Sequence, residues 1–164
     1  MNLKKVVYFF LGILIIGSMF IPHILMEKAE VRFSSWGSIM PLYELSEPVY
    51  IWNKLEYDGL LVPTVEDALF VTKEEDTIPI VDSPVEAYLI EGQQGGILGE
   101  SDMKSDLDRV PLSGYKLNKN QMHIVFRIDE ESDKEFLKNI NGFLVNYKVL
   151  GVDKSVTLEL VLVK

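Results

Sequence analysis

The chain has 164 residues, no cysteine and a formal net charge of −9. The lack of cysteine excludes disulfides, thiol catalysis and cysteine-ligated metals. Lys4 and Lys5 are the only charged residues before Glu27, so 14 of the 16 basic and all 25 acidic residues follow, a net charge of −11. Such a domain repels phosphate backbones and would attract cations, so we expect no nucleic-acid partner, although negative charge also serves plain solubility.

The first element expected along the chain is a membrane-spanning helix. An uncharged run of 21 residues extends from Val6 to Met26. At about 1.5 Å per residue, such a helix spans roughly 30 Å, the thickness of the hydrocarbon core of a bilayer. A soluble helix normally carries a polar stripe, which this run lacks. The lipid bilayer is therefore the first partner that the sequence predicts, through residues 6–26.

The same run is expected to remain as an uncleaved anchor. It is longer than the apolar region of a signal peptide, and no A-x-A site follows it, because Glu27 stands two residues before Ala29. Lys4 and Lys5 place the N-terminus in the cytoplasm by the positive-inside rule. We thus expect a single-pass protein of the cell membrane, typical of a bacterial envelope without disulfide chemistry. The predicted organisation is a cytoplasmic head (1–5), a transmembrane signal anchor (6–26), a short tether (27–34) and an extracytoplasmic β-sandwich domain (35–164).

Patterns typical of strands follow the anchor. The segment VYIWNKLEY (49–57) is rich in β-branched and aromatic residues, and Asp58-Gly59 after it is a pair typical of a hairpin turn. DALFVTKEEDTIPIVD (67–82) gives a short apolar run, an acidic turn and a second apolar run. PVEAYLIEG (84–92) is a further strand candidate that ends at Gly92.

The C-terminal part alternates more regularly. In QMHIVFRID (121–129) one face is apolar and the other carries His123 and Arg127, which predicts a half-buried strand. A short helix is expected within 129–141, and GFLVNYKVLG (142–151) predicts another strand. The last strand, SVTLELVLVK (155–164), is apolar on both faces near its end, which favours a central or covered position.

Seven to nine short strands predict an all-β domain after one transmembrane helix. We expect an antiparallel β-sandwich, Ig-like in the broad sense, with a small barrel as the alternative. The Ig signature itself is missing, since the chain has no cysteine pair and Tyr147 lies late in its strand. The sequence resembles no particular family closely enough to name one.

No motif predicts catalysis, a cofactor or a metal. His123 is the single histidine after the anchor, and neither a G-x-S-x-G elbow nor an H-E-x-x-H motif occurs. The glycine-dense segment EGQQGGILGE (91–100) lacks the lysine of a phosphate-binding loop, so a hairpin or bulged loop is expected there. SDMKSDLD (101–108) carries three aspartates but does not match a calcium loop, and calcium binding stays a minor alternative. We therefore expect no enzyme activity.

The function predicted from this organisation is a non-enzymatic binding or accessory module for an envelope or membrane complex, with another membrane protein as its partner. One alternative is a ligand-binding or hydrolytic domain that acts on wall polymer or a cationic peptide, and another is an immunity or envelope-protection protein. Aromatic residues dominate interface hot spots, so the candidate partner surface consists of Trp36, Tyr50, Trp52 and Tyr57. Core or membrane-interface packing is the competing explanation for these four side chains.

Overall fold

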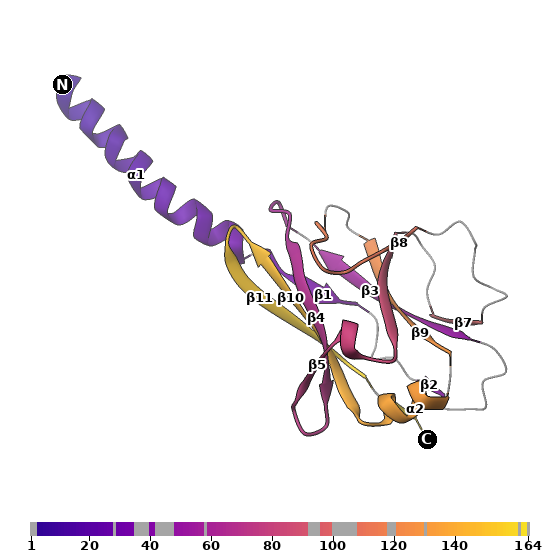
Figure 1. Ribbon diagram of the computed structural model, residues 1–164. Coiled ribbons are helices and arrows are strands. Elements are labelled where there is room, and N and C mark those ends of the chain that lie inside the picture. The colour runs from indigo at the N-terminus through magenta and orange to yellow at the C-terminus, as the bar shows by residue number, and fades with distance from the viewer. Residues whose placement is uncertain are drawn as a thin grey trace.

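The protein is mostly β-structure, arranged as two antiparallel sheets, as the sequence predicts. The computed structural model describes residues 3–27, 29–34, 40–41, 48–57, 59–91, 96–99, 108–117, 121–129, 131–160 and 162–163. One long helix projects from the β-domain, and Figure 1 shows that the two lie end to end.

The larger sheet has six strands in the order β1-β3-β9-β6-β8. The sixth strand, β7, pairs with the first half of β3, on the edge whose second half pairs with β1. The strand bounds are β1 Val31–Phe33, β3 Val49–Tyr57, β6 Glu86–Glu91, β7 Gly96–Gly99, β8 Arg109–Val110 and β9 Gln121–Ile128.

The smaller sheet has four strands in the order β11-β10-β4-β5, and a separate short pair joins β2 to β12 in parallel. The strands of the smaller sheet are β4 Thr64–Thr72, β5 Thr77–Pro79, β10 Ile140–Val149 and β11 Val152–Glu159. The remaining elements are α1 Leu3–Glu27, β2 Met40–Pro41, the 3-10 turn η1 Ile80–Asp82, α2 Glu131–Lys138 and β12 Leu162–Val163.

The main core lies between the two sheets, which is the arrangement of a β-sandwich. Alternate residues of β9 and β10 point into it, as their period of two predicts. Three phenylalanines join the sheets at its centre: the ring of Phe143 lies 5.1 Å from that of Phe70 and 4.8 Å from that of Phe126. Edge-to-face contacts of this kind add stability beyond the buried area itself.

Two expectations about connections and edges are wrong. The pair Asp58-Gly59 does not close a hairpin, because β3 and β4 belong to different sheets and the chain crosses between them here. Within the described sheet β11 is an edge strand and not a central one, while the apolar end that favoured a central or covered position continues into β12, which pairs with β2. Turn residues serve a sheet-to-sheet crossover as well as a hairpin, so local sequence does not separate the two.

Two predicted irregular segments contain strands. Residues 27–34, the expected tether, include β1, so the sheet begins before residue 35. The glycine-dense segment 91–100 includes β7, whose residues Gly96–Gly99 pair with β3. Glycine-rich sequence therefore served here as an edge strand. The short helix expected within 129–141 is confirmed as α2.

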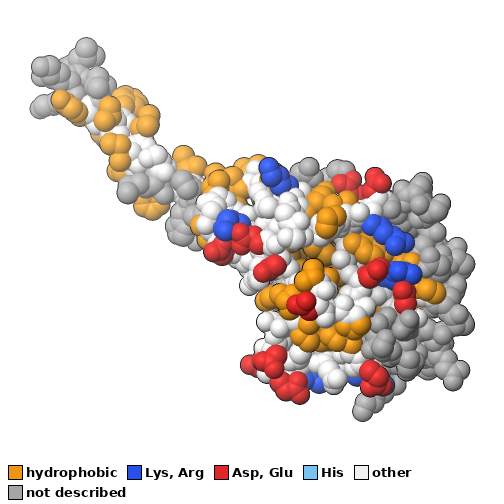
Figure 2. Space-filling model, viewed as in Figure 1, with side chains coloured by type: hydrophobic (Ala, Val, Ile, Leu, Met, Phe, Trp, Pro, Cys, Tyr) orange, Lys and Arg blue, Asp and Glu red, His pale blue; other side chains and the backbone are white. Residues whose placement is uncertain are grey.

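Helix α1 exposes apolar side chains on all sides and points away from the domain (Figures 1 and 2). Each of the following is at least 50 % exposed: Tyr8, Phe9, Phe10, Leu11, Ile13, Leu14, Ile15, Ile16, Phe20, Ile21 and Ile24. Among the described residues, no helix has the length and hydropathy of a membrane span.

Candidate functional site

The structure separates the three predicted partner residues that it describes, Tyr50, Trp52 and Tyr57. Tyr50 and Trp52 lie together on the outer face of the six-stranded sheet, and both are buried. Tyr57 faces the opposite way, into the main core, because it lies seven and five positions after them along β3, and side chains an odd number of positions apart point to opposite faces of a strand. Trp36 lies outside the described residues. The aromatic residues of this region therefore serve two different cores.

The outer face carries a second apolar cluster that the sequence analysis missed. We call it the outer cluster, and its members are Tyr50, Trp52, Tyr88, Ile90 and Val125. The sequence does contain one indication of this cluster. Val125 is apolar, although it lies on the face of β9 that also carries His123 and Arg127. The half-buried description of β9 was thus incomplete, since both of its faces are covered.

One cation lies against two aromatic rings on this face. The guanidinium of Arg109 lies 5.1 Å from the ring centroid of Tyr88 and 5.8 Å from that of Tyr50. Burial raises the pKa of Tyr88 to about 12, and the positive charge of Arg109 opposes that rise. Tyr88 therefore stays neutral at physiological pH. The arrangement favours cation–π packing over acid–base chemistry.

His123 is buried, not exposed as its strand position suggested. Its ring lies 5.4 Å from the ring of Trp52 in an edge-to-face contact. Nearby Arg127 pairs with Glu86 at 3.3 Å and with Asp129 at 3.1 Å. The polar side chains of β9 thus pack and pair across the outer face.

A groove lies between two parts of the sandwich. One part is β5 together with η1, and the other is the segment that follows β8. Its volume is about 350 Å³. We call it the β5–β8 groove, and its lining residues include Asp67, Ala68, Pro79, Val81, Pro111 and Ser113. Figure 2 shows hydrophobic side chains gathered on this face of the domain, with charged ones around them. The lining is mostly apolar, which suits an apolar side chain of a partner.

Strand β4 lines this groove at a place where one of its two edges is not paired with another strand. β5 pairs with Leu69 to Val71, and Tyr115 accepts a hydrogen bond of 2.8 Å from the N–H of Val65 farther along. Between these two contacts, Asp67 and Ala68 pair within the described sheet only on the side of β10. A short open edge beside an apolar groove is a setting in which an extended peptide can add as a strand.

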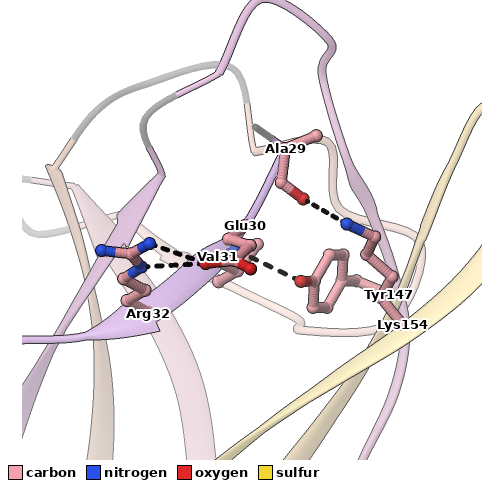
Figure 3. Close-up of polar contacts among 6 residues, drawn as sticks. All are labelled: Ala29, Glu30, Val31, Arg32, Tyr147 and Lys154. Atoms are coloured by element: carbon pink, nitrogen blue, oxygen red, sulfur yellow. Dashed lines mark hydrogen bonds and ion pairs between the residues drawn. The ribbon is translucent and has the colours of Figure 1, made fainter. Parts of the chain in front are cut away.

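The junction between α1 and the domain is fastened by hydrogen bonds, as Figure 3 shows. The N–H of Val31 donates to the hydroxyl of Tyr147 at 3.2 Å, and Nζ of Lys154 donates to the carbonyl of Ala29 at 3.2 Å. Ala29 and Val31 are buried, at 0 % and 3 % exposure. Burial raises the pKa of Tyr147, which keeps its hydroxyl neutral.

The described residues contain no group of three or more His, Asp or Glu side chains placed to hold a metal ion. Residues 101–107 of the aspartate-rich segment lie outside the described part, so calcium binding there stays a prediction. Compared with known families, curated proteins and solved structures, the chain matches no family model, no curated protein and no solved structure.

Proposed function

We propose that the protein is a single-pass membrane protein whose β-sandwich, Ig-like in the broad sense, is a non-enzymatic binding module for a partner membrane or envelope protein. The N-terminus would be cytoplasmic and the domain extracytoplasmic. The anchor rests on the uncharged run Val6–Met26, which is as long as a bilayer is thick. The exposed apolar surface of α1 supports it, because leaving so much apolar surface in contact with water costs free energy, which burial in lipid would remove.

The observation that carries the proposal is the fastened junction. Helix α1 ends at Glu27, and Ala29 and Val31 are already buried and hydrogen-bonded in the domain. Very few residues therefore separate α1 from the sandwich. A domain held this way works next to the membrane surface and reaches only partners that lie there. The β5–β8 groove and the exposed edge of β4 at Asp67 supply the binding mode, strand addition with an apolar side chain in the groove.

A second candidate is a ligand-binding domain for a cationic peptide. The groove volume of about 350 Å³ favours it, since that is near the lower size of small-molecule sites. The net charge of −11 after the anchor run would attract a cationic ligand. Asp67 lines the groove, although it accepts a hydrogen bond of 2.7 Å from Asn146.

The test is cross-linking in cells with the tagged full-length protein, followed by detergent extraction of the membrane fraction and mass spectrometry. One control carries residues 1–28 without the domain. Val81→Asp places a charge in the groove at a residue that is 90 % exposed, so the fold should tolerate it. Glu74→Gln, in the exposed β4–β5 turn, is the matched surface control.

A membrane protein recovered with the full chain and with Glu74→Gln, but reduced for Val81→Asp, is the expected result. Recovery of the same protein by the control without a domain would contradict a binding role of the sandwich. If nothing specific is recovered, the accessory function is wrong, and the peptide-binding candidate takes its place.

A further inference from the structure

Outside α1, exposed large apolar side chains are concentrated at one end of the domain. Five occur among the described residues, and four of these lie in or directly beside two connections, β3–β4 and β10–β11. We call these four the apolar tip: Leu60 is 86 % exposed, Val62 50 %, Leu150 63 % and Val152 41 %. The fifth, Val81, belongs to the β5–β8 groove. Single exposed apolar residues are ordinary, but a group of four on neighbouring connections is not.

Both connections lie at the end of the sandwich where α1 joins it. Val31 pairs with Tyr57, the last residue before the β3–β4 connection. Thr64, the first residue after that connection, pairs with Lys148, just before the β10–β11 turn. Nζ of Lys154, just after the same turn, donates to the carbonyl of Ala29. Figure 1 shows the β10–β11 hairpin beside the C-terminal end of α1.

The β10–β11 turn holds a leucine where folding favours another residue. Leu150 and Gly151 have φ angles of +49° and +79°, and Val149 pairs with Val152 around them. Two-residue turns of this shape favour Asn-Gly, because a branched apolar side chain is strained at positive φ. Leu150 is strained and also solvent-exposed, so neither local conformation nor core packing explains it. An unfavourable residue that packing does not explain is a reason to look for a function.

We propose that the apolar tip is a second membrane contact, seated in the interfacial layer of the same leaflet from which α1 emerges. This inference rests on the proposed function, since α1 must first anchor the chain. The surface that the tip contacts is the bilayer, because the tip lies at the end of the domain that α1 anchors. With α1 and the tip both in contact, the domain would keep one orientation and present the β5–β8 groove at a defined height.

The contact is apolar in character and does not depend on anionic lipid. Lys148, beside the turn, is paired with Glu66 and with Asp153 at 3.1 Å. These partners raise the pKa of Lys148 and neutralise its charge locally. The four side chains of the tip are themselves uncharged, so their contact with the bilayer gains little from anionic headgroups. Binding of the tip should therefore persist in vesicles of phosphatidylcholine alone and at high salt.

The test uses the full-length protein in phosphatidylcholine vesicles. Because the chain has no cysteine, a single Leu60→Cys can carry an environment-sensitive fluorophore, with Glu74→Cys in the β4–β5 turn as the distant reference. We expect a blue shift at position 60 and quenching there by lipids with a spin label near the headgroup. The reference position should show neither. Flotation of the vesicles reports separately on anchoring.

A second substitution then tests the tip itself. Leu150→Asn suits the positive φ of the turn, so its unfolding midpoint should stay equal or rise while the blue shift at position 60 decreases. Val81→Asn, at an apolar residue that is even more exposed and lies away from the tip, should leave the shift unchanged. If the protein floats with the vesicles but position 60 is as solvated as position 74, the tip contact is wrong and the anchor stands. If the protein does not float, the proposed function fails, and this inference with it.

Discussion

Tyr88 and Tyr147 are both buried tyrosines, yet their hydroxyl groups have opposite consequences for folding. The hydroxyl of Tyr147 accepts a hydrogen bond from the N–H of Val31 and so fastens β1 to β10. The hydroxyl of Tyr88 is buried in the outer cluster and has no hydrogen-bond partner among the described residues. Burying a hydroxyl without a partner costs free energy, whereas a buried hydrogen bond repays it.

Replacing these two hydroxyl groups should therefore change the free energy of unfolding in different directions. Tyr147→Phe should lower it by about 1 kcal/mol, because the N–H of Val31 loses its acceptor. Tyr88→Phe should leave it unchanged or raise it by up to about 1 kcal/mol, because only an unsatisfied group is removed. Urea denaturation measures both. An equal loss in the two variants would mean that Tyr88 has a partner in the folded protein.

At the scale of elements, the connection between β3 and β4 shows how local sequence and tertiary packing combine. A Cβ at Gly59 would meet the hydroxyl and ring carbons of Tyr57, whose side chain is only 6 % exposed. The ring thus folds back over the connection that carries the chain from one sheet to the other. Glycine is needed here for the close approach of a side chain, and not for a hairpin turn.

Gly59→Ala should lower the free energy of unfolding by about 1–3 kcal/mol, because the buried ring of Tyr57 must move to make room. Leu60→Ala, one residue on, is the matched control. Its side chain is 86 % exposed, so the change should stay within about 0.5 kcal/mol. Thermal unfolding followed by circular dichroism compares the two. A neutral Gly59→Ala would show that Tyr57 is free to leave its position over the connection.

Periodicity predicted some elements well and others not at all. β9 and β10 were predicted from their alternation, because the face that enters the main core is apolar along both strands. β1 and β7 were missed, since three or four residues are too few to show a period and Gly96–Gly99 lacks strand-forming residues. Their strand conformation is imposed by the free edge of β3, which both of them cover.

At the scale of the whole molecule, the sandwich begins earlier than the tether prediction implied. β1 supplies the pairing partner for the second half of β3, and Val31 enters the main core. A fragment that starts at residue 35 would expose that edge and lose the fastening by Tyr147. A fragment that starts at residue 29 keeps all of these contacts.

The two fragments should consequently differ in stability. The 29–164 fragment should unfold at the same temperature as the domain in the full-length protein, because α1 points away from the sandwich. The 35–164 fragment should lose about 2 kcal/mol or more, since burial of Val31 alone contributes about 1.5–3 kcal/mol. Differential scanning calorimetry of both fragments decides this. Equal midpoints would restore residues 27–34 to the role of a plain tether.

The sequence by itself determined the class of this protein: a long uncharged run followed by strands whose alternation requires a shared core. Those properties are local, because periodicity and the length of an apolar run are set by neighbouring residues. The tertiary structure alone decided which strands pair, that Tyr50 and Trp52 face away from Tyr57, and that Leu60 and Leu150 lie at the end of the domain that holds Ala29. These properties depend on contacts between segments far apart in the chain, and a local pattern carries no record of which distant strand will become its neighbour.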